Sequence, residues 1–94
     1  MNDSKLLNQE ELQEIIRELD GWQLKQGSIK KEWSFKDFIE AFGFMSKVAL
    51  ISESMNHHPN FYNVYNTLII ELSTHDSNGV THKDIILAKA INKL

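Results

Sequence analysis

Histidines bracket one β-rich segment of this 94-residue chain. His57 and His58 stand side by side in "NHHP", and His75 follows in "STHDSNG". Histidine exchanges protons near neutral pH, because its unperturbed pKa is about 6.5. Two or three imidazoles around one pocket can therefore protonate a leaving group and accept a proton elsewhere. Proton transfer is thus one use of these residues, but a histidine pair just after a helix is, taken alone, more often surface structure than catalytic.

A metal site is the alternative use of these histidines, with carboxylates from Glu53 or Asp84. The spacing argues against it, because neighbouring side chains in extended backbone point to opposite faces, so His57 and His58 would diverge. The sequence also has no HExxH pattern and no cysteine. We therefore expect no metal.

Composition limits the classes of function. With 94 residues and 41% hydrophobic content, the chain has room for one domain, residues 1–94. It has no long apolar run and no leader sequence, so we expect a cytoplasmic protein that binds no membrane. A chain of this size can also enter a nucleus passively. The net charge of −3 and the lack of a basic block argue against direct binding to nucleic acid.

The first half of the chain predicts a helix, a hairpin and a second helix. Asn8 can cap a helix with Glu11 at its third position, and Asp20-Gly21 ends that helix. Alternating apolar residues on either side of "QGS" indicate a β-hairpin over residues 22–35. Ser34-x-x-Asp37 resembles a capping box and predicts a long helix over residues 36–55.

This long helix has two apolar stripes. One stripe is Phe38, Phe42, Met45 and Ala49, and the neighbouring one is Ala41, Phe44, Val48, Ile51 and Met55. An amphipathic surface helix normally has one apolar face. Either the core face is wide, or part of the helix is buried in a partner subunit.

The second half of the chain predicts two strands and a last helix. Residues 61–74 are β-rich, and Asn66 could form a turn that divides them. Thr81-x-x-Asp84 predicts the start of a helix. The order is α-β-β-α-β-β-α, an α+β fold with a four-stranded antiparallel sheet and its helices packed on one face.

Motifs at these separations closely resemble the pterin-4a-carbinolamine dehydratase family. The similarity is carried by Glu53-x-x-x-His57-His58-Pro59, Asn63-Val64-Tyr65-Asn66, Ser73-Thr74-His75-Asp76 and Gly79-Val80-Thr81-x-x-Asp84. Gly21-Trp22 and "FKDFIEAFGFMSKVAL" also match, so the resemblance runs from about Leu12 to Ala90. Asn78 stands where the family commonly has a second glycine, and asparagine tolerates a positive φ better than most residues.

The resemblance implies dehydration of 4a-hydroxytetrahydropterin to quinonoid dihydropterin and water, in the recycling of tetrahydrobiopterin after aromatic amino acid hydroxylation. It places His57, His58 and His75 at the pterin pocket as catalytic residues. We expect His57 and His75 to handle the departing hydroxyl and the N5 proton, in either order, and His58 to orient the ring or assist. No cofactor is implied beyond the pterin substrate.

The same resemblance suggests substrate-binding residues, and each has a structural alternative. They are Trp22, Glu53, Pro59, Thr74 and Asp84. Trp22 could cover the pterin ring or belong to the core. Glu53 could bind an imidazole or face solvent, and Asp84 could serve the site or only cap a helix. His82 matches no family histidine, and we expect it to be exposed.

The resemblance also implies a second class of function. Animal members act as dimerisation cofactors of a homeodomain transcription factor of liver, through the long helix that also builds their tetramer. Such a module would need Phe44, Val48, Ile51 and similar helix residues. We therefore expect a homo-oligomer, either a dimer that pairs sheet edges or a tetramer joined by these helices.

Overall fold

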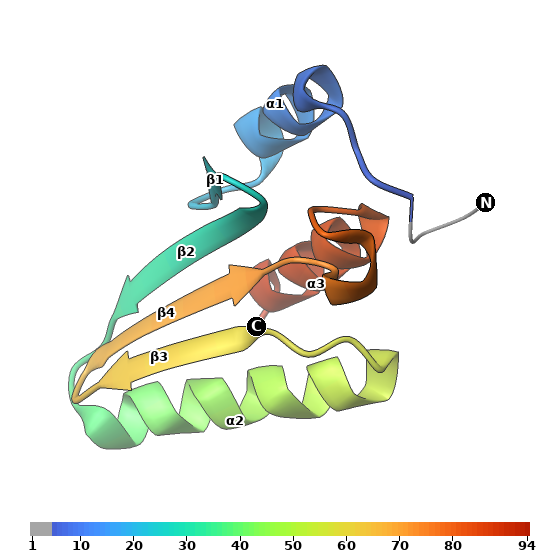
Figure 1. The fold of residues 1–94 in the computed structure, drawn as a ribbon. Helices are drawn as coiled ribbons and strands as arrows, with labels where there is room; N and C mark the ends of the chain where they lie inside the picture. Colours follow the sequence, from blue (N-terminus) through green and yellow to red (C-terminus); the bar gives the residue numbers. More distant parts are fainter. Residues whose placement is uncertain (1–4) are drawn as a thin grey trace.

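The computed structural model describes residues 5–94, which follow the predicted order of elements (Figure 1). The helices are α1 (Gln9–Glu18), α2 (Phe38–Met55) and α3 (His82–Asn92). The strands are β1 (Gln23–Lys25), β2 (Ser28–Ser34), β3 (Asn60–Val64) and β4 (Thr67–Leu72), and a short 3-10 helix, η1 (His75–Ser77), precedes α3. The predicted α+β class is confirmed, and so is the turn at Asn66 between β3 and β4.

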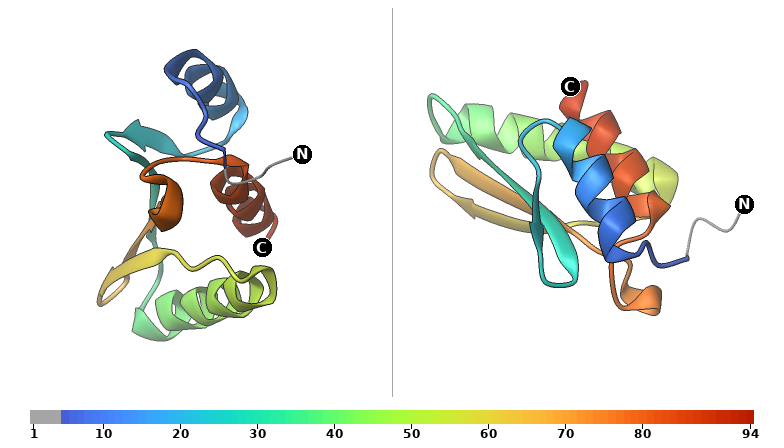
Figure 2. Two further views of the ribbon diagram at one scale, coloured as in Figure 1. Left: turned by 45° about the vertical axis from the view of Figure 1, so that its right-hand side comes forward. Right: turned by 90° about the horizontal axis from the view of Figure 1, so that it is seen from above.

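The four strands form one sheet in the order β1-β2-β4-β3, and every neighbouring pair is antiparallel. All three helices lie on the same side of this sheet, as Figure 2 shows. The inner strand β4 alternates along its length, with Leu68, Ile70 and Leu72 fully buried and the residues between them half-buried. One face of the sheet therefore carries the core.

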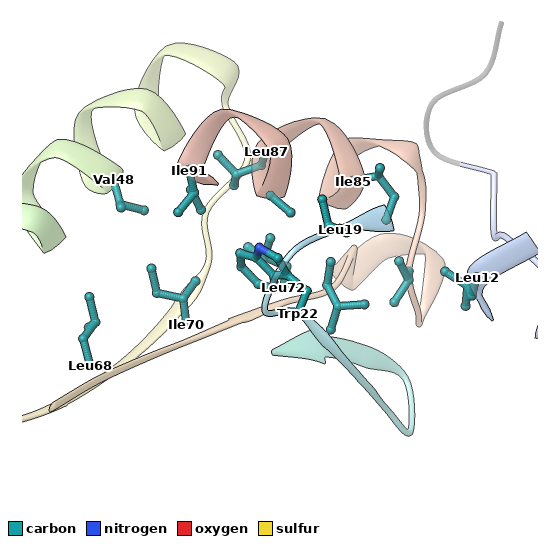
Figure 3. Close-up of a cluster of buried hydrophobic side chains, with 13 residues drawn as sticks. Leu12, Leu19, Trp22, Val48, Leu68, Ile70, Leu72, Ile85, Leu87 and Ile91 are labelled. Carbon is teal, nitrogen blue, oxygen red and sulfur yellow. The ribbon is translucent and has the colours of Figure 1, made fainter. Parts of the chain in front are cut away.

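The core lies between β4 and the helices (Figure 3). Val48 of α2 and Leu87 of α3 are completely buried there, and Ile91 is 1% exposed. Apolar burial of this kind contributes about 25 cal/mol per Å² removed from water. Because α2 and α3 pack against each other and the sheet, the end of α2 and the start of α3 are held in defined positions.

Local capping interactions set where the helices begin. Asn8 and Glu11 form the predicted capping box of α1, and Thr81 and Asp84 form that of α3. The predicted box at the start of α2 is wrong. The N-cap of α2 is Asp37, whose Oδ1 accepts a hydrogen bond from the Glu40 amide at 2.9 Å. Residue 34 instead ends β2, where it pairs with residue 67 of β4.

The two apolar stripes of α2 have different environments. Ala41 and Val48 are buried, and Phe44, Ile51 and Met55 pack partly against the core. Of the residues predicted for a partner surface, Val48 is therefore unavailable, while Phe44 and Ile51 are only partly exposed. Large exposed side chains lie elsewhere on the helix: Phe38 (46% exposed), Ile39 (81%), Phe42 (51%) and Leu50 (73%). Within residues 5–94, no helix combines the length and apolar character that crossing a membrane requires.

Candidate active site

One hollow of about 330 Å³ is lined by all three predicted catalytic histidines. It lies where the end of α2, the η1 segment and the start of α3 meet. Its lining residues are Asn56, His57, His58, Ser73, Thr74, His75, Asp76 and Lys83. The structure therefore brings together imidazoles that are up to 18 positions apart in the chain.

A larger hollow, of about 500 Å³, lies between the start of the chain and the β1–β2 turn. Apolar side chains and amides dominate its lining, and Lys25 is the ionisable residue among the described residues that form it. Proton transfer needs groups that change charge near the working pH, so the histidine hollow is the stronger candidate despite its smaller volume.

The end of α2 positions the first two histidines. Asn56 adopts the left-handed conformation (φ 51°, ψ 42°) that commonly terminates a helix. The His57 amide then donates to the carbonyl of Ser52 at 3.0 Å, which turns the chain out of the helical path. The two neighbouring imidazoles meet different partners, and only 10% of the His57 side chain is exposed against 57% for His58.

His57 is paired with a buried carboxylate. Its Nε2 lies 2.6 Å from Oδ1 of Asp84, which is completely buried. The other oxygen, Oδ2, accepts hydrogen bonds from the Thr74 hydroxyl and the Thr81 amide, each at 2.9 Å. A buried charge is tolerable only when such partners replace water. Asp84 thus caps α3 and also contacts His57, although it does not itself line the hollow.

His58 is paired with Glu53, but near the surface. Its Nε2 lies 2.8 Å from the Glu53 Oε1, with the carboxylate side chain 79% exposed. Exposed pairs of this kind contribute about 0.2–1 kcal/mol to stability. The pair therefore matters more for orienting the His58 ring than for holding the fold.

His75 reaches the hollow from the 3-10 segment η1 and is exposed. The loop closes through Asn78, whose φ of 58° is left-handed, as the sequence predicts for an asparagine at a glycine-like position. The Thr74 amide donates to the Gly79 carbonyl at 2.7 Å, which ties both ends of the loop together. Within the part of the chain that the structure describes, the position of His75 is therefore set by the loop and not by a side-chain partner.

Some predicted residues lie apart from the hollow. Trp22 is 3% exposed, and its Nε1 donates to Asn92 Oδ1 at 3.0 Å, so its indole belongs to the core and does not line the hollow. Pro59 is half-buried beyond the histidine pair and is also absent from the lining. His82 is half-buried, so the prediction that it is exposed is wrong.

Four polar lining residues were given no site role from the sequence: Asn56, Ser73, Asp76 and Lys83. Each of them adjoins a predicted site residue, and proximity to the motifs was the one signal that could have found them. Among residues 5–94, no group of three or more His, Asp or Glu side chains is placed to hold a metal ion.

Fold and hollow together define a small α+β protein with a histidine-lined site. The chain belongs to the pterin 4 alpha carbinolamine dehydratase family, whose model matches residues 5–94. Two curated relatives from Prochlorococcus marinus, strains MIT 9303 and MIT 9312, are provisionally named pterin-4-alpha-carbinolamine dehydratases. They are 51% and 53% identical over 89 residues, which cover 95% of this chain and 93% of each relative.

Solved structures show the same fold. A protein from Brucella melitensis described as a transcriptional coactivator/pterin dehydratase superimposes with a TM-score of 0.88 and is 44% identical, covering 93% of this chain and 95% of its own. A pterin dehydratase-like protein, described as a RuBisCO assembly factor of the alpha-carboxysome, is 19% identical with a TM-score of 0.62, covering 77% of this chain and 83% of its own. At that identity the second match supports the fold alone.

Proposed function

We propose that this protein dehydrates pterin-4a-carbinolamine to quinonoid dihydropterin and water by histidine acid–base catalysis. The observation that carries the proposal is the hollow at which His57, His58 and His75 meet. Family membership supports the substrate class. In a cell that hydroxylates aromatic amino acids, the reaction would recycle tetrahydrobiopterin.

The reaction needs two proton transfers at neighbouring atoms of the pterin. The 4a-hydroxyl must receive a proton to leave as water, and N5 must lose one as the C4a=N5 double bond forms. His57 and His75 are assigned to these transfers, and His58 to orienting the ring with Glu53 as its partner. General acid–base catalysis of this kind contributes about 10²–10⁴-fold.

Binding is assigned to the residues around the histidines. Thr74 lines the hollow, while Asp84 acts through His57. Pro59 fixes the backbone that follows the histidine pair. Contact between Trp22 and the ring stays a prediction, and it would need the indole to leave its present partners. The proposed reaction uses no metal and no cofactor beyond its pterin substrate.

A coupled assay tests this function. A hydroxylase generates the carbinolamine, and its ultraviolet decay is followed with and without this protein. We expect faster decay with the wild type and a loss of about 10²–10⁴-fold in His57→Ala and His75→Ala. His82→Asn is a matched control, because His82 does not line the hollow. Decay at the spontaneous rate with wild-type protein would overturn the proposal.

A second candidate function is assembly through α2, favoured by the exposed Phe38, Ile39, Phe42 and Leu50. Large exposed apolar side chains gathered on one helix commonly mark a protein interface. We propose a homodimer or homotetramer, with the exposed edge strand β3 as the other available surface. A homeodomain transcription factor would be a further partner only in a cell that has one.

Light scattering with Phe42→Asp and Leu50→Asp tests this assembly. Both positions lie away from the hollow, so each variant should reduce the particle size while leaving carbinolamine decay faster than the spontaneous rate. A wild-type protein of only 10.9 kDa at micromolar concentration would contradict the assembly.

A further inference from the structure

A chain of buried hydroxyl groups lies behind His57. The Thr81 and Thr74 hydroxyl oxygens are 2.6 Å apart, and the Thr74 hydroxyl donates to Asp84 Oδ2 at 2.9 Å. Thr81 and Asp84 are completely buried, and Thr74 is 5% exposed. The network is therefore largely shielded from water, with Thr74 at its border with the hollow.

Each hydrogen bond among Thr81, Thr74 and Asp84 has a defined donor. A threonine hydroxyl has one proton to donate. Thr74 gives its proton to Asp84, so the 2.6 Å contact must be donated by Thr81. The Thr81 oxygen in turn accepts from the Lys83 amide at 3.2 Å. All these protons point towards the carboxylate.

Oδ2 of Asp84 is consequently a hydrogen-bond acceptor. Oδ2 already accepts hydrogen bonds from the Thr74 hydroxyl and the Thr81 amide. Both of its lone pairs are therefore occupied, and it has no room for a proton of its own. Oδ1 meets His57 Nε2 at 2.6 Å. Hydrogen bonds to a carboxylate favour its charged form, and a charged carboxylate only accepts, so this arrangement favours the proton on Nε2. The hydrogen bond on one ring nitrogen decides the state of the other.

The second nitrogen of His57 is open to the hollow. Nδ1 makes no hydrogen bond within residues 5–94, and every buried polar side-chain atom in that part of the chain has a partner. Nδ1 must therefore be accessible to solvent, on a residue that lines the hollow. With the ring proton on Nε2, Nδ1 presents a lone pair.

We infer that Thr81, Thr74 and Asp84 form a positioning network that holds neutral His57 as its Nε2–H tautomer and makes Nδ1 the proton acceptor of the site. The inference deepens the proposed dehydration and rests on it for the identity of the substrate proton. Thr81 and Thr74 act through Asp84, and Asp84 acts through His57.

The assignment gives each transfer a direction. Nδ1 of His57 takes the proton from N5, and the N–H electron pair forms the C4a=N5 bond. The C4a–O bond breaks with its electron pair on oxygen, and a protonated His75 supplies the proton that completes water. One proton is accepted and one is donated, so each turnover is neutral after both imidazoles exchange with solvent.

Nitrogen NMR on the free protein tests the tautomer directly. Histidine ring nitrogens labelled with ¹⁵N distinguish protonated from lone-pair nitrogen, and His57→Ala identifies the resonances of His57. At mildly alkaline pH, where free imidazole is neutral, we expect a protonated Nε2 and an unprotonated Nδ1. A protonated Nδ1 in the wild type would overturn the inference.

The Asp84→Asn variant is nearly isosteric and should reverse the tautomer of His57. Two donors face the Oδ2 position, so the amide oxygen should occupy that side and the amide nitrogen should face His57. Nε2 must then accept, and the ring proton moves to Nδ1. We expect the inverted tautomer and a fall in kcat of about 10²–10⁴-fold. An unchanged tautomer in this variant would also overturn the inference.

Thr74→Val and Thr74→Ser separate positioning from simple folding. Valine keeps the shape and removes the hydroxyl, so kcat should fall about 10–100-fold, which corresponds to the loss of one hydrogen bond to a charged group. Serine keeps the donor and should retain the wild-type tautomer. Equal kcat for the valine and serine variants would contradict the network.

The tautomer inference and the proposed dehydration are contradicted by different results. An active wild type with a protonated Nδ1 overturns the tautomer inference alone. A wild type that leaves the carbinolamine at its spontaneous rate overturns the proposed function, and the base role of His57 with it, whatever the NMR shows.

Discussion

The backbone at Asn56 offers a sharp test of how the fold positions its histidines. Asn56 has a φ of 51° directly before His57. An L-residue in this left-handed region loses about 1–2 kcal/mol, and glycine loses nothing there sterically. Asn56→Ala and Asn56→Gly both remove the amide from the hollow, so the difference between them reports backbone conformation.

The expected difference follows from two opposing terms. The strain on alanine is about 1–2 kcal/mol, and the greater freedom of glycine in the unfolded chain offsets about 0.4–1 kcal/mol of it. Asn56→Ala should therefore be about 1 kcal/mol less stable than Asn56→Gly. For a chain of 60–100 residues this lowers Tm by about 4–8 °C.

Urea unfolding of both variants, at one protein concentration because assembly would shift the midpoint, measures this difference. The slope m should be unchanged. We also expect slower carbinolamine decay in the alanine variant, since a displacement of about 1 Å can cost about 10²-fold. An alanine variant as stable as the glycine variant would show that the left-handed backbone at residue 56 carries no strain.

Three further predictions concern other parts of the molecule. Asn92→Ala removes the acceptor shared by Trp22 Nε1 and Lys31 Nζ, so the free energy of unfolding, measured in urea, should fall by about 1–3 kcal/mol. Leu72→Ala in the core should cost about 2–5 kcal/mol in the same experiment, and a cost near zero would contradict the packing described. Glu53→Gln should change the free energy of unfolding by at most about 1 kcal/mol, because the pair that Glu53 forms with His58 is exposed. A larger loss in thermal unfolding would show that the pair has a structural role.

Much of the fold could be predicted because its signals are local. The capping boxes at Asn8 and Thr81 involve residues three positions apart, so a short stretch of sequence contains the whole interaction. The alternation in β4 records directly which side chains face the core. Asn78 likewise takes the positive φ that its residue type allows.

The start of α2 could not be predicted in the same way. Ser34 has the right spacing to cap a helix, but it pairs with Thr67 in the neighbouring strand, and that partner lies 33 positions away. Asp37 then takes the capping position. The two stripes of α2 were equally ambiguous, because the sequence shows apolar character but not which side meets the sheet.

The candidate site was also predictable only in part. Histidine spacing and the family resemblance predict the three imidazoles that the structure places at one hollow. They do not show that Asp84 contacts His57 while Glu53 contacts His58, because that depends on how α3 meets the end of α2. Trp22 shows the converse, since a residue matched to the pocket wall is held in the core by Asn92.

The most direct test of the account is the rate at which purified 4a-hydroxytetrahydropterin decays in the presence of this protein. We expect decay faster than the spontaneous reaction, proportional to protein concentration and reduced by about 10²–10⁴-fold in His57→Ala. Decay at the spontaneous rate at every protein concentration would contradict it, and assembly through α2 would then be the function left to test.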